Sequence, residues 1–276
     1  MASLQSLFES VYELRIGALA QTPFCADLRS GKSPTDIHAE AIERGFDDLP
    51  VRDTDGVIRR VVATSALRSA SGWSDVQKRA VTLTADTLVA RDAPAFSLLD
   101  RFAEPDRVIL FCLGRGGVDG VVTIFDLNAP AAHLLAFGLA LIVESEVAVV
   151  LRAELGEDPK EALRRVQQVL PNASGIARWK QAHAQGRDLD LASALLFFEK
   201  TQLLERYGGS ALAAQCGCSK RTLMRELTAI RKMRNAVAHN DESYRLTNPR
   251  WVHSRMRRTL ALARQLAETS ADADVA

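Results

Sequence analysis

Two segments of this chain of 276 residues share one pattern: a strand, a glycine-containing turn and a second strand that runs into a helix. The first is Leu49–Leu67 (LPVRDTDGVIRRVVATSAL) and the second is Arg107–Leu127 (RVILFCLGRGGVDGVVTIFDL). Apolar runs on both sides of a short glycine turn predict a β-hairpin in each segment. Because Val62 and Val122 are sixty residues apart, we interpret the pair as an internal duplication of a helix–strand–turn–strand–helix unit.

A helix is also expected before the hairpin of each repeat. Ser33 and Pro34 are typical of a helix N-terminus, because serine caps free backbone N–H groups and proline fits the first turn. Ala95–Phe102 places three apolar side chains on one helical face. Residues 1–152 are therefore predicted to form an α+β module of two repeats.

The strand patterns stop after Gly156, and the rest of the chain predicts an all-α bundle over residues 157–270. Arg178–His183 is assigned to a polar stretch between helices, and residues 271–276 to a disordered tail. Five helices are predicted in this half: Pro159–Val169, Leu189–Tyr207, Ser210–Cys216, Ser219–Ala238 and Trp251–Thr269.

The net charge of +1 conceals two halves of opposite sign. Residues 1–156 carry 15 Lys and Arg against 21 Asp and Glu, whereas residues 157–276 carry 20 against 13. Lys220–Arg264 alone has 12 basic and 3 acidic residues. Such a density favours binding to a polyanion. The alternative is a solvated basic face, or one that docks on the acidic half.

The remaining composition favours a cytoplasmic protein. Four cysteines give no disulfide framework, and Cys216-x-Cys218 lacks neighbouring ligands for a metal site, as does the rest of the sequence. The N-terminus has no basic segment typical of a secretory signal. The most apolar run, Leu134–Val143, is ten residues long, whereas a membrane span needs about 20. We therefore expect a buried or dimer-interface helix and no membrane partner.

The second repeat ends in GVVTIFD, residues 120–126. Together with the duplicated hairpins, this segment resembles the CBS-domain pair, whose repeats close on a G-x-x-T/S-x-x-D element. The resemblance covers about residues 15–150 and implies an adenine nucleotide as regulatory ligand, with Thr123 on the phosphate and Asp126 on the ribose hydroxyls. The first repeat departs from the pattern, because Arg60 replaces the glycine and Leu67 stands where the aspartate is expected.

Thr123 and Asp126 also fit a simpler interpretation. A threonine followed three residues later by aspartate is an ordinary N-cap pair, which stabilises the next helix by about 1 kcal/mol. A CBS pair with a purely structural or dimerising role therefore stays open beside nucleotide binding.

In the basic half, RKMRNAVAHN (residues 231–240) contains an R-N-x-x-x-H pattern. It resembles the signature of HEPN domains, compact helical bundles of which many are metal-independent ribonucleases that act as dimers. The resemblance implies that His239 is the general acid and base, that Arg234 contacts the scissile phosphate and that Asn235 orients them. Arg231 and Lys232 are expected to contact RNA.

These residue types suit RNA cleavage through the 2′-hydroxyl. The reaction needs a group that exchanges protons near neutral pH, as histidine does, and a planar cation for the charge that develops on phosphorus. The spacing alone is weak, because Arg178 and His183 repeat it. Two alternatives remain. His239 can be an ordinary histidine at a helix C-terminus, where the helix dipole favours a cation, or the HEPN module can be inactive and only bind its partner. In the HEPN family the dimer brings two copies of the motif into one cleft, and Glu199 is expected to face that cleft.

A rival interpretation involves residues 211–227. Ala213, Gly217 and Leu223 have the spacing of a helix-turn-helix, in which Ser219, Lys220, Arg221 and Arg225 would face the major groove of DNA. The same spacing also serves any tight pair of helices.

Together these patterns predict a tandem CBS-like module followed by a HEPN-like bundle. The expected function is that of a nucleotide-regulated endoribonuclease, a toxin- or defence-like effector that acts as a homodimer on RNA. A CBS-sensing transcriptional regulator that binds DNA is the alternative.

Overall fold

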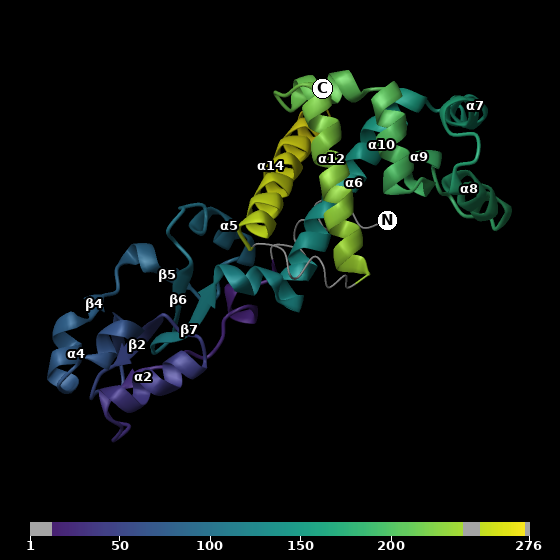
Figure 1. The fold of residues 1–276 in the computed structure, drawn as a ribbon. Coiled ribbons are helices and arrows are strands. Elements are labelled where there is room, and N and C mark those ends of the chain that lie inside the picture. The colour runs from purple at the N-terminus through teal and green to yellow at the C-terminus, as the bar shows by residue number, and fades with distance from the viewer. Residues whose placement is uncertain (1–12, 240–248, 274–276) are drawn as a thin grey trace. The chain divides into compact units, whose positions relative to one another are not determined.

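The computed structural model describes residues 13–239 and 249–273, and the chain divides into two compact units. The N-terminal unit covers residues 12–131, and the helical unit begins at Ala132. Figure 1 shows strands only in the first of them, where β2, β4, β5, β6 and β7 are labelled.

The first sheet of the N-terminal unit has the strand order β1-β2-β3-β4. β1 is parallel to β2, and the other pairs are antiparallel. The strands are Ala26–Asp27, Asp48–Arg52, Ile58–Ala63 and Val81–Thr82. The helices of this repeat are α2 (Pro34–Glu43), α3 (Thr64–Arg68) and α4 (Trp73–Arg79). Ser33 caps α2 in a capping box with Asp36, as its sequence predicts.

The second sheet repeats this order with β5 parallel to β6 and β6 antiparallel to β7. Its strands are Leu88–Ala90, Ile109–Gly114 and Gly117–Thr123. Short helical segments accompany it: η1 (Ile16–Ala18), η2 (Ala85–Thr87), η3 (Ala95–Ser97), α5 (Leu98–Arg101) and η4 (Ile124–Asn128).

The registers of the two hairpins confirm the duplication. Leu49 pairs with Val62 in the first, and Leu110 pairs with Val122 in the second. Each hairpin also has one register shift, at Val51/Arg52 and at Cys112/Leu113 respectively. A bulge at the same place in both copies is a shared architectural feature, because bulges fix the local twist of a strand pair.

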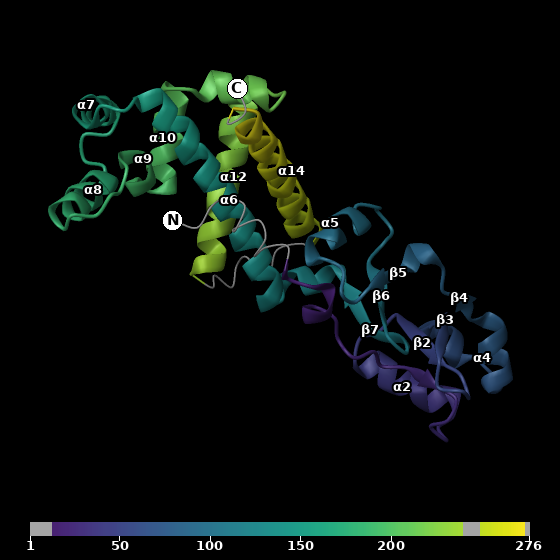
Figure 2. The same cartoon turned by 180° about the vertical axis from the view of Figure 1, so that it is seen from behind.

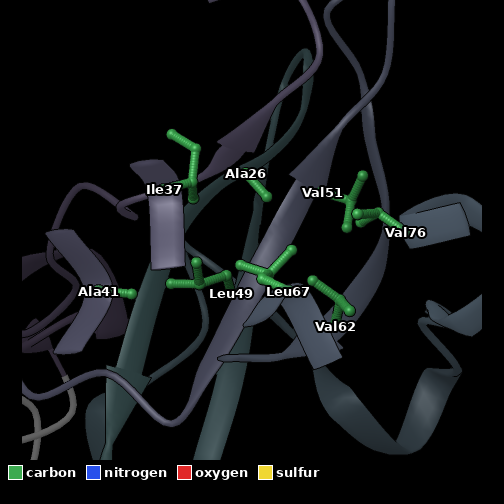
Figure 3. Close-up of a cluster of buried hydrophobic side chains, with 8 residues drawn as sticks. All are labelled: Ala26, Ile37, Ala41, Leu49, Val51, Val62, Leu67 and Val76. Atoms are coloured by element: carbon green, nitrogen blue, oxygen red, sulfur yellow. The ribbon is translucent and has the colours of Figure 1, made fainter. Parts of the chain in front are cut away.

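The core of the first repeat lies between its sheet and its helices (Figure 3). It consists of small and branched aliphatic side chains, all at most 3% exposed: Ala26, Ile37, Ala41, Leu49, Val51, Val62, Leu67 and Val76. Leu49 and Val51 face this core from alternate positions of β2, although Pro50 between them is also buried, and Ile37 and Ala41 of α2 recur at helical spacing.

The helical unit contains no strand among its described residues. Figure 2 shows α6, α10, α12 and α14 as its main helices. The helices are α6 (Pro130–Leu155), α7 (Pro159–Val169), α8 (Ser174–Ala184), α9 (Leu191–Ala194), α10 (Phe197–Arg206), α11 (Gly209–Gln215), α12 (Lys220–Ala238) and α14 (Pro249–Ala273).

Three predictions for this half need correction. Arg178–His183 lies within helix α8 rather than in a linker. The predicted helix Leu189–Tyr207 is broken into α9 and α10, because Leu195 and Leu196 have extended backbones. The tail is shorter than predicted, since α14 continues to Ala273; residues 274–276 lie outside the described part.

Helix α6 spans 26 residues, far beyond the apolar run Leu134–Val143. By length and composition it could cross a membrane, and 56% of its most apolar window is buried inside the structure. A core helix of a soluble protein meets the same criteria, so this finding is weak evidence for a membrane span. The compact units divide between Ala131 and Ala132, not near residue 156, because α6 packs as part of the helical unit.

Candidate functional site

Arg234, Asn235 and His239 lie at the C-terminal end of α12. A guanidinium nitrogen of Arg234 donates to Oδ1 of Asn235 over 3.1 Å. His239 is the C-cap residue, and its backbone N–H donates to the carbonyl of Asn235 over 3.0 Å. Residues four apart share a helical face, so Asn235 and His239 lie on one side and Arg234 reaches that side through Asn235. The side chain of His239 is exposed, and Asn240 lies outside the described residues.

A buried ion cluster fixes the other side of Arg234. Nζ of Lys200 on α10 lies 3.0 Å from Oε1 of Glu144 on α6, and Nη2 of Arg234 lies 3.5 Å from Oε2 of the same carboxylate. The side chains of Lys200 and Glu144 are 6% and 12% exposed. The cluster therefore joins three helices and leaves one net positive charge on a helix end. Sequence reasoning missed Glu144 and Lys200, because 56 residues separate them.

The two residues expected to bind RNA differ in their surroundings. The guanidinium carbon of Arg231 lies 4.7 Å from the ring centroid of Phe198, a cation–π contact. Lys232 is exposed to solvent. Arg231 is thus held on the surface of α10, whereas Lys232 is available to a phosphate.

Glu199 does not face a cleft, which corrects the expectation for it. Its side chain is 6% exposed, and its carboxylate accepts hydrogen bonds from the backbone N–H groups of Ser174, Gly175 and Leu196. It therefore caps both α8 and α10.

Thr123 and Asp126 form a capping box at the junction of β7 and η4. The hydroxyl and the backbone N–H of Thr123 donate to Oδ2 of Asp126 over 2.8 and 2.6 Å. The other oxygen, Oδ1, accepts from Nε2 of Gln21 over 2.6 Å. Asp126 is only 8% exposed. A ribose hydroxyl that binds the Asp126 carboxylate has to share Oδ1 with Gln21 or displace the Gln21 side chain.

The register changes the comparison with the first repeat. Because Val62 takes the place of Val122, Ala63 and Ala66 occupy the positions of Thr123 and Asp126, one residue before Thr64 and Leu67. Arg60 does occupy the glycine position, where it pairs with Asp53 and donates to the carbonyl of Gln77. The first repeat thus lacks both polar groups of the second.

Two helices, α11 and α12, and a turn between them occupy the segment for which a helix-turn-helix is the rival prediction, an arrangement that any tight helix pair shares. Gly217 in the turn has a φ of +59°, a left-handed conformation that favours glycine. Ser219 caps α12 by accepting from the backbone N–H of Thr222. Leu223 is 1% exposed, whereas Arg221 and Arg225 face solvent.

The helical unit also has a cavity of about 320 Å³, which sequence reasoning did not anticipate. Trp179 and His183 of α8 line it with their rings 4.5 Å apart, and Asp190, which also lines it, forms an ion pair with Arg152. Burial alone would raise the pKa of Asp190, but hydrogen bonds from Ser193 and the charge of Arg152 hold it below its usual value. No group of three metal-ligating side chains occurs in the described residues.

No family model matches the sequence, and no curated protein matches it. Among solved structures, CBS-domain pairs align with the N-terminal part. A protein assigned to acetoin utilization, from Vibrio cholerae, aligns at 16% identity over 44% of this chain and 92% of its own, with a TM-score of 0.35.

Two further structures are similar over nearly the same share of the chain. A CBS-domain pair in complex with 5′-methylthioadenosine and S-adenosyl-L-methionine aligns at 14% identity over 41% of this chain and 95% of its own, with a TM-score of 0.32. The CBS domain of a bacterial CNNM/CorC family Mg²⁺ transporter, in complex with ATP, aligns at 18% identity over 45% of this chain and 91% of its own, with a TM-score of 0.33. At such scores the likeness carries no conclusion about the site, which rests on the contacts above.

Proposed function

We propose that this chain is an endoribonuclease whose N-terminal unit binds an adenine nucleotide as a regulatory ligand. The observation that carries the catalytic half is the group at the end of α12. There Arg234 is held between Glu144 and Asn235, and Asn235 shares a helical face with His239.

The proposed reaction is transfer within the RNA. Neutral His239 takes the proton of a 2′-hydroxyl, the 2′-oxygen attacks phosphorus, and the bond from phosphorus to the 5′-oxygen breaks. The imidazolium then gives its proton to the leaving 5′-oxygen, so a 2′,3′-cyclic phosphate and a 5′-hydroxyl remain. Arg234 donates to the phosphate oxygens, where negative charge increases in the transition state. We expect a homodimer, in which two copies of the α12 end contribute to one cleft.

Cleavage of labelled RNA in EDTA tests this half. Wild type is expected to yield cyclic-phosphate ends, and His239→Ala to lose at least about 100-fold in rate, the size of a general acid–base contribution. His183→Ala is the matched control, because His183 has the same R-x4-H spacing but lies on α8. RNA binding without cleavage by wild type would indicate the inactive module instead.

The regulatory half rests on Thr123 and Asp126, a hydroxyl and a carboxylate held together at the end of β7. Calorimetric titration with ATP is expected to show binding that Asp126→Ala weakens at least tenfold. Thr87→Ala is the control, because the Thr87 hydroxyl bonds the backbone of Thr84 at η2, the position that Asp126 has at η4. Equal loss in both variants would mean that the pair only stabilises the fold.

A DNA-binding regulator is the second candidate, and the observed α11–turn–α12 geometry favours it specifically. Arg221 and Arg225 are exposed on the first half of α12. In that case duplex DNA is bound with sequence preference, Arg225→Ala weakens binding, and RNA stays intact. A cytoplasmic toxin- or defence-like role belongs to the nuclease proposal alone.

A further inference from the structure

The residue that holds Arg234 lies on the helix that directly follows the Thr123–Asp126 pair. η4, which this pair caps, ends at Asn128, and α6 begins at Pro130. The one intervening residue, Ala129, donates its backbone N–H to the carbonyl of Asp126 over 2.9 Å. The same continuous helix carries Glu144, about 21 Å along its axis from Pro130 at about 1.5 Å per residue.

Arg234 contacts two partners at once, each through a different guanidinium nitrogen. Its distance to Asn235, on its own helix, is 3.1 Å. Its distance to Glu144, on α6, is 3.5 Å, longer than the usual 2.7–3.2 Å of an N–H···O hydrogen bond. Nε of Arg234 and Oε2 of Glu144 are both buried without a hydrogen-bond partner among the described residues. A shift of α6 by less than about 1 Å would therefore complete or break the contact, and helix shifts of 1–2 Å are common in regulated proteins.

Lys200 makes Glu144 a stable contact for this purpose. Its ammonium group lies 3.0 Å from the carboxylate, and both side chains are nearly buried. A buried charge without a partner is costly, so Lys200 supplies the counter-charge of the carboxylate whether or not Arg234 is bound to it.

We propose that α6 transmits nucleotide binding at Thr123 and Asp126 to Arg234, with Glu144 as the contact that moves. The proposal rests on the proposed function and adds its route of regulation. Binding of ATP at the pair repositions η4 and the start of α6, and Glu144 gains or releases Arg234. Nη2 of Arg234 then either stays on Glu144 or is released to contact an RNA phosphate, while Nη1 remains on Asn235.

The test follows two readouts in the full-length protein with ATP as the probe. The first is the NMR resonance of the Arg234 Nε–H group, which reports the partner of the guanidinium without any cleavage. The second is the rate of RNA cleavage with and without saturating ATP. In wild type, ATP is expected to move the resonance and to change the rate at least about 5-fold, the lower end of allosteric couplings.

Glu144→Gln is expected to bind ATP as wild type does and to lose both responses. Glu226→Gln is the matched control, because Glu226 is similarly buried and joins α12 to α14 through Arg255 over 2.7 Å. Since Glu144→Gln leaves Lys200 without its partner, the double variant with Lys200→Met is measured too, as removal of both charges is tolerated better than removal of one.

The outcomes separate the two proposals. ATP binding without any response at Arg234 in wild type, or a full response in both Glu144 variants, would overturn the coupling and leave nucleotide binding intact. Equal loss in Glu226→Gln would overturn the role of Glu144. Absence of ATP binding in wild type would overturn the regulatory half of the proposed function, and the coupling with it. A response at the Arg234 resonance without RNA cleavage would refute the nuclease and support the coupling.

Discussion

At the scale of single residues, Glu199 shows how one buried carboxylate sets the course of the chain. It accepts from backbone N–H groups at the start of α8 and at the start of α10. Those groups have no partner within their own helices, because the first turn of any helix leaves its N–H groups free. The break between α9 and α10 is therefore stabilised by a side chain three residues downstream.

Glu199→Ala is expected to lower the free energy of unfolding by about 3 kcal/mol, because three hydrogen bonds to a charged acceptor are lost and the N–H group of buried Gly175 is left unpaired. Urea denaturation measures the change. Glu205→Ala, at an exposed position of the same helix, should stay within about 0.5 kcal/mol of wild type. Similar values for both variants would contradict the capping role.

The cysteines are expected to react in a definite order. Burial raises the pKa of Cys112 and of Cys216 to about 11, and it also raises the pKa of Cys25. Thiolate is the reactive form, so these thiols should be slow at neutral pH. Cys218 is the most exposed of the four, and we expect iodoacetamide to modify it first, as peptide mass spectrometry will show. Early modification of Cys112 would argue against this core.

Local pairs could be predicted from the sequence, and distant ones could not. Thr123 and Asp126 are three residues apart, so their contact follows from helix geometry. Gln21 is 105 residues from Asp126 in the sequence, and Glu144 is likewise distant in the sequence from Lys200 and Arg234. Such contacts depend on how helices and strands pack, which the period of a sequence does not encode. The motif Arg234–His239 was visible, but the group that holds it was not.

At the scale of elements, the packing of β7 explains why the closing motif of the second repeat begins with a glycine, Gly120. A Cβ atom at this position would lie 3.1 Å from Cβ of Cys112 and 3.2 Å from Cβ of Ala20. These distances are tighter than ordinary van der Waals contacts. The glycine is therefore explained by packing of β7 against its neighbours.

Gly120→Ala is expected to destabilise the N-terminal unit by about 1–3 kcal/mol through overpacking. Gly116→Ala is the control, because nothing lies within 4 Å of a Cβ atom there. Thermal unfolding followed by circular dichroism distinguishes them. If Gly120→Ala were as stable as Gly116→Ala, the sheet would have room that these distances exclude.

Helix α7 is expected to lose stability in acid. Hydrogen bonds from Arg164 and Arg165 lower the pKa of Glu161 from 4.5 to about 2. A lowered pKa in the folded state stabilises above the unfolded value, and this contribution is lost as the pH falls from 4.5 towards about 2. Glu161→Gln should therefore be less stable than wild type at pH 7, by a difference that shrinks below pH 4.5 in urea denaturation. With both arginines replaced by Gln, that difference should no longer depend on pH.

The elements that sequence reasoning placed well have strong local signals. α2 has a serine cap and proline, and both hairpins have glycine turns. α8 was missed because Arg178, Lys180 and Gln181 give it a polar surface, and only Gly175, Ile176 and Ala182 of this helix are buried. The break at Leu195 was missed because an apolar run continues through it, and apolar periodicity does not report an extended residue that a distant cap stabilises.

At the scale of the whole molecule, ligand should protect the two units to different extents, even though the proposed coupling links them through α6. Each is compact by itself, and the proposed nucleotide pair lies in the first. At 100 times the dissociation constant, ATP should stabilise the N-terminal unit by about 2.7 kcal/mol. Hydrogen exchange is the measurement, with slower exchange expected in β6 and β7 than in α8. If ATP slowed hydrogen exchange in α8 as much as in β6 and β7, the result would contradict a site confined to the N-terminal unit.

The position of α6 also sets how this architecture could have been assembled by gene fusion. A helical unit transferred to another sensor without residues 130–155 would lack the helix that carries Glu144, and Lys200 would be buried without its counter-charge. A viable recombination breakpoint has to fall ahead of α6, within the few codons between Thr123 and Pro130. The segment that can be transferred as one unit therefore starts at α6, about 26 residues before residue 156, where the net charge of the chain changes sign.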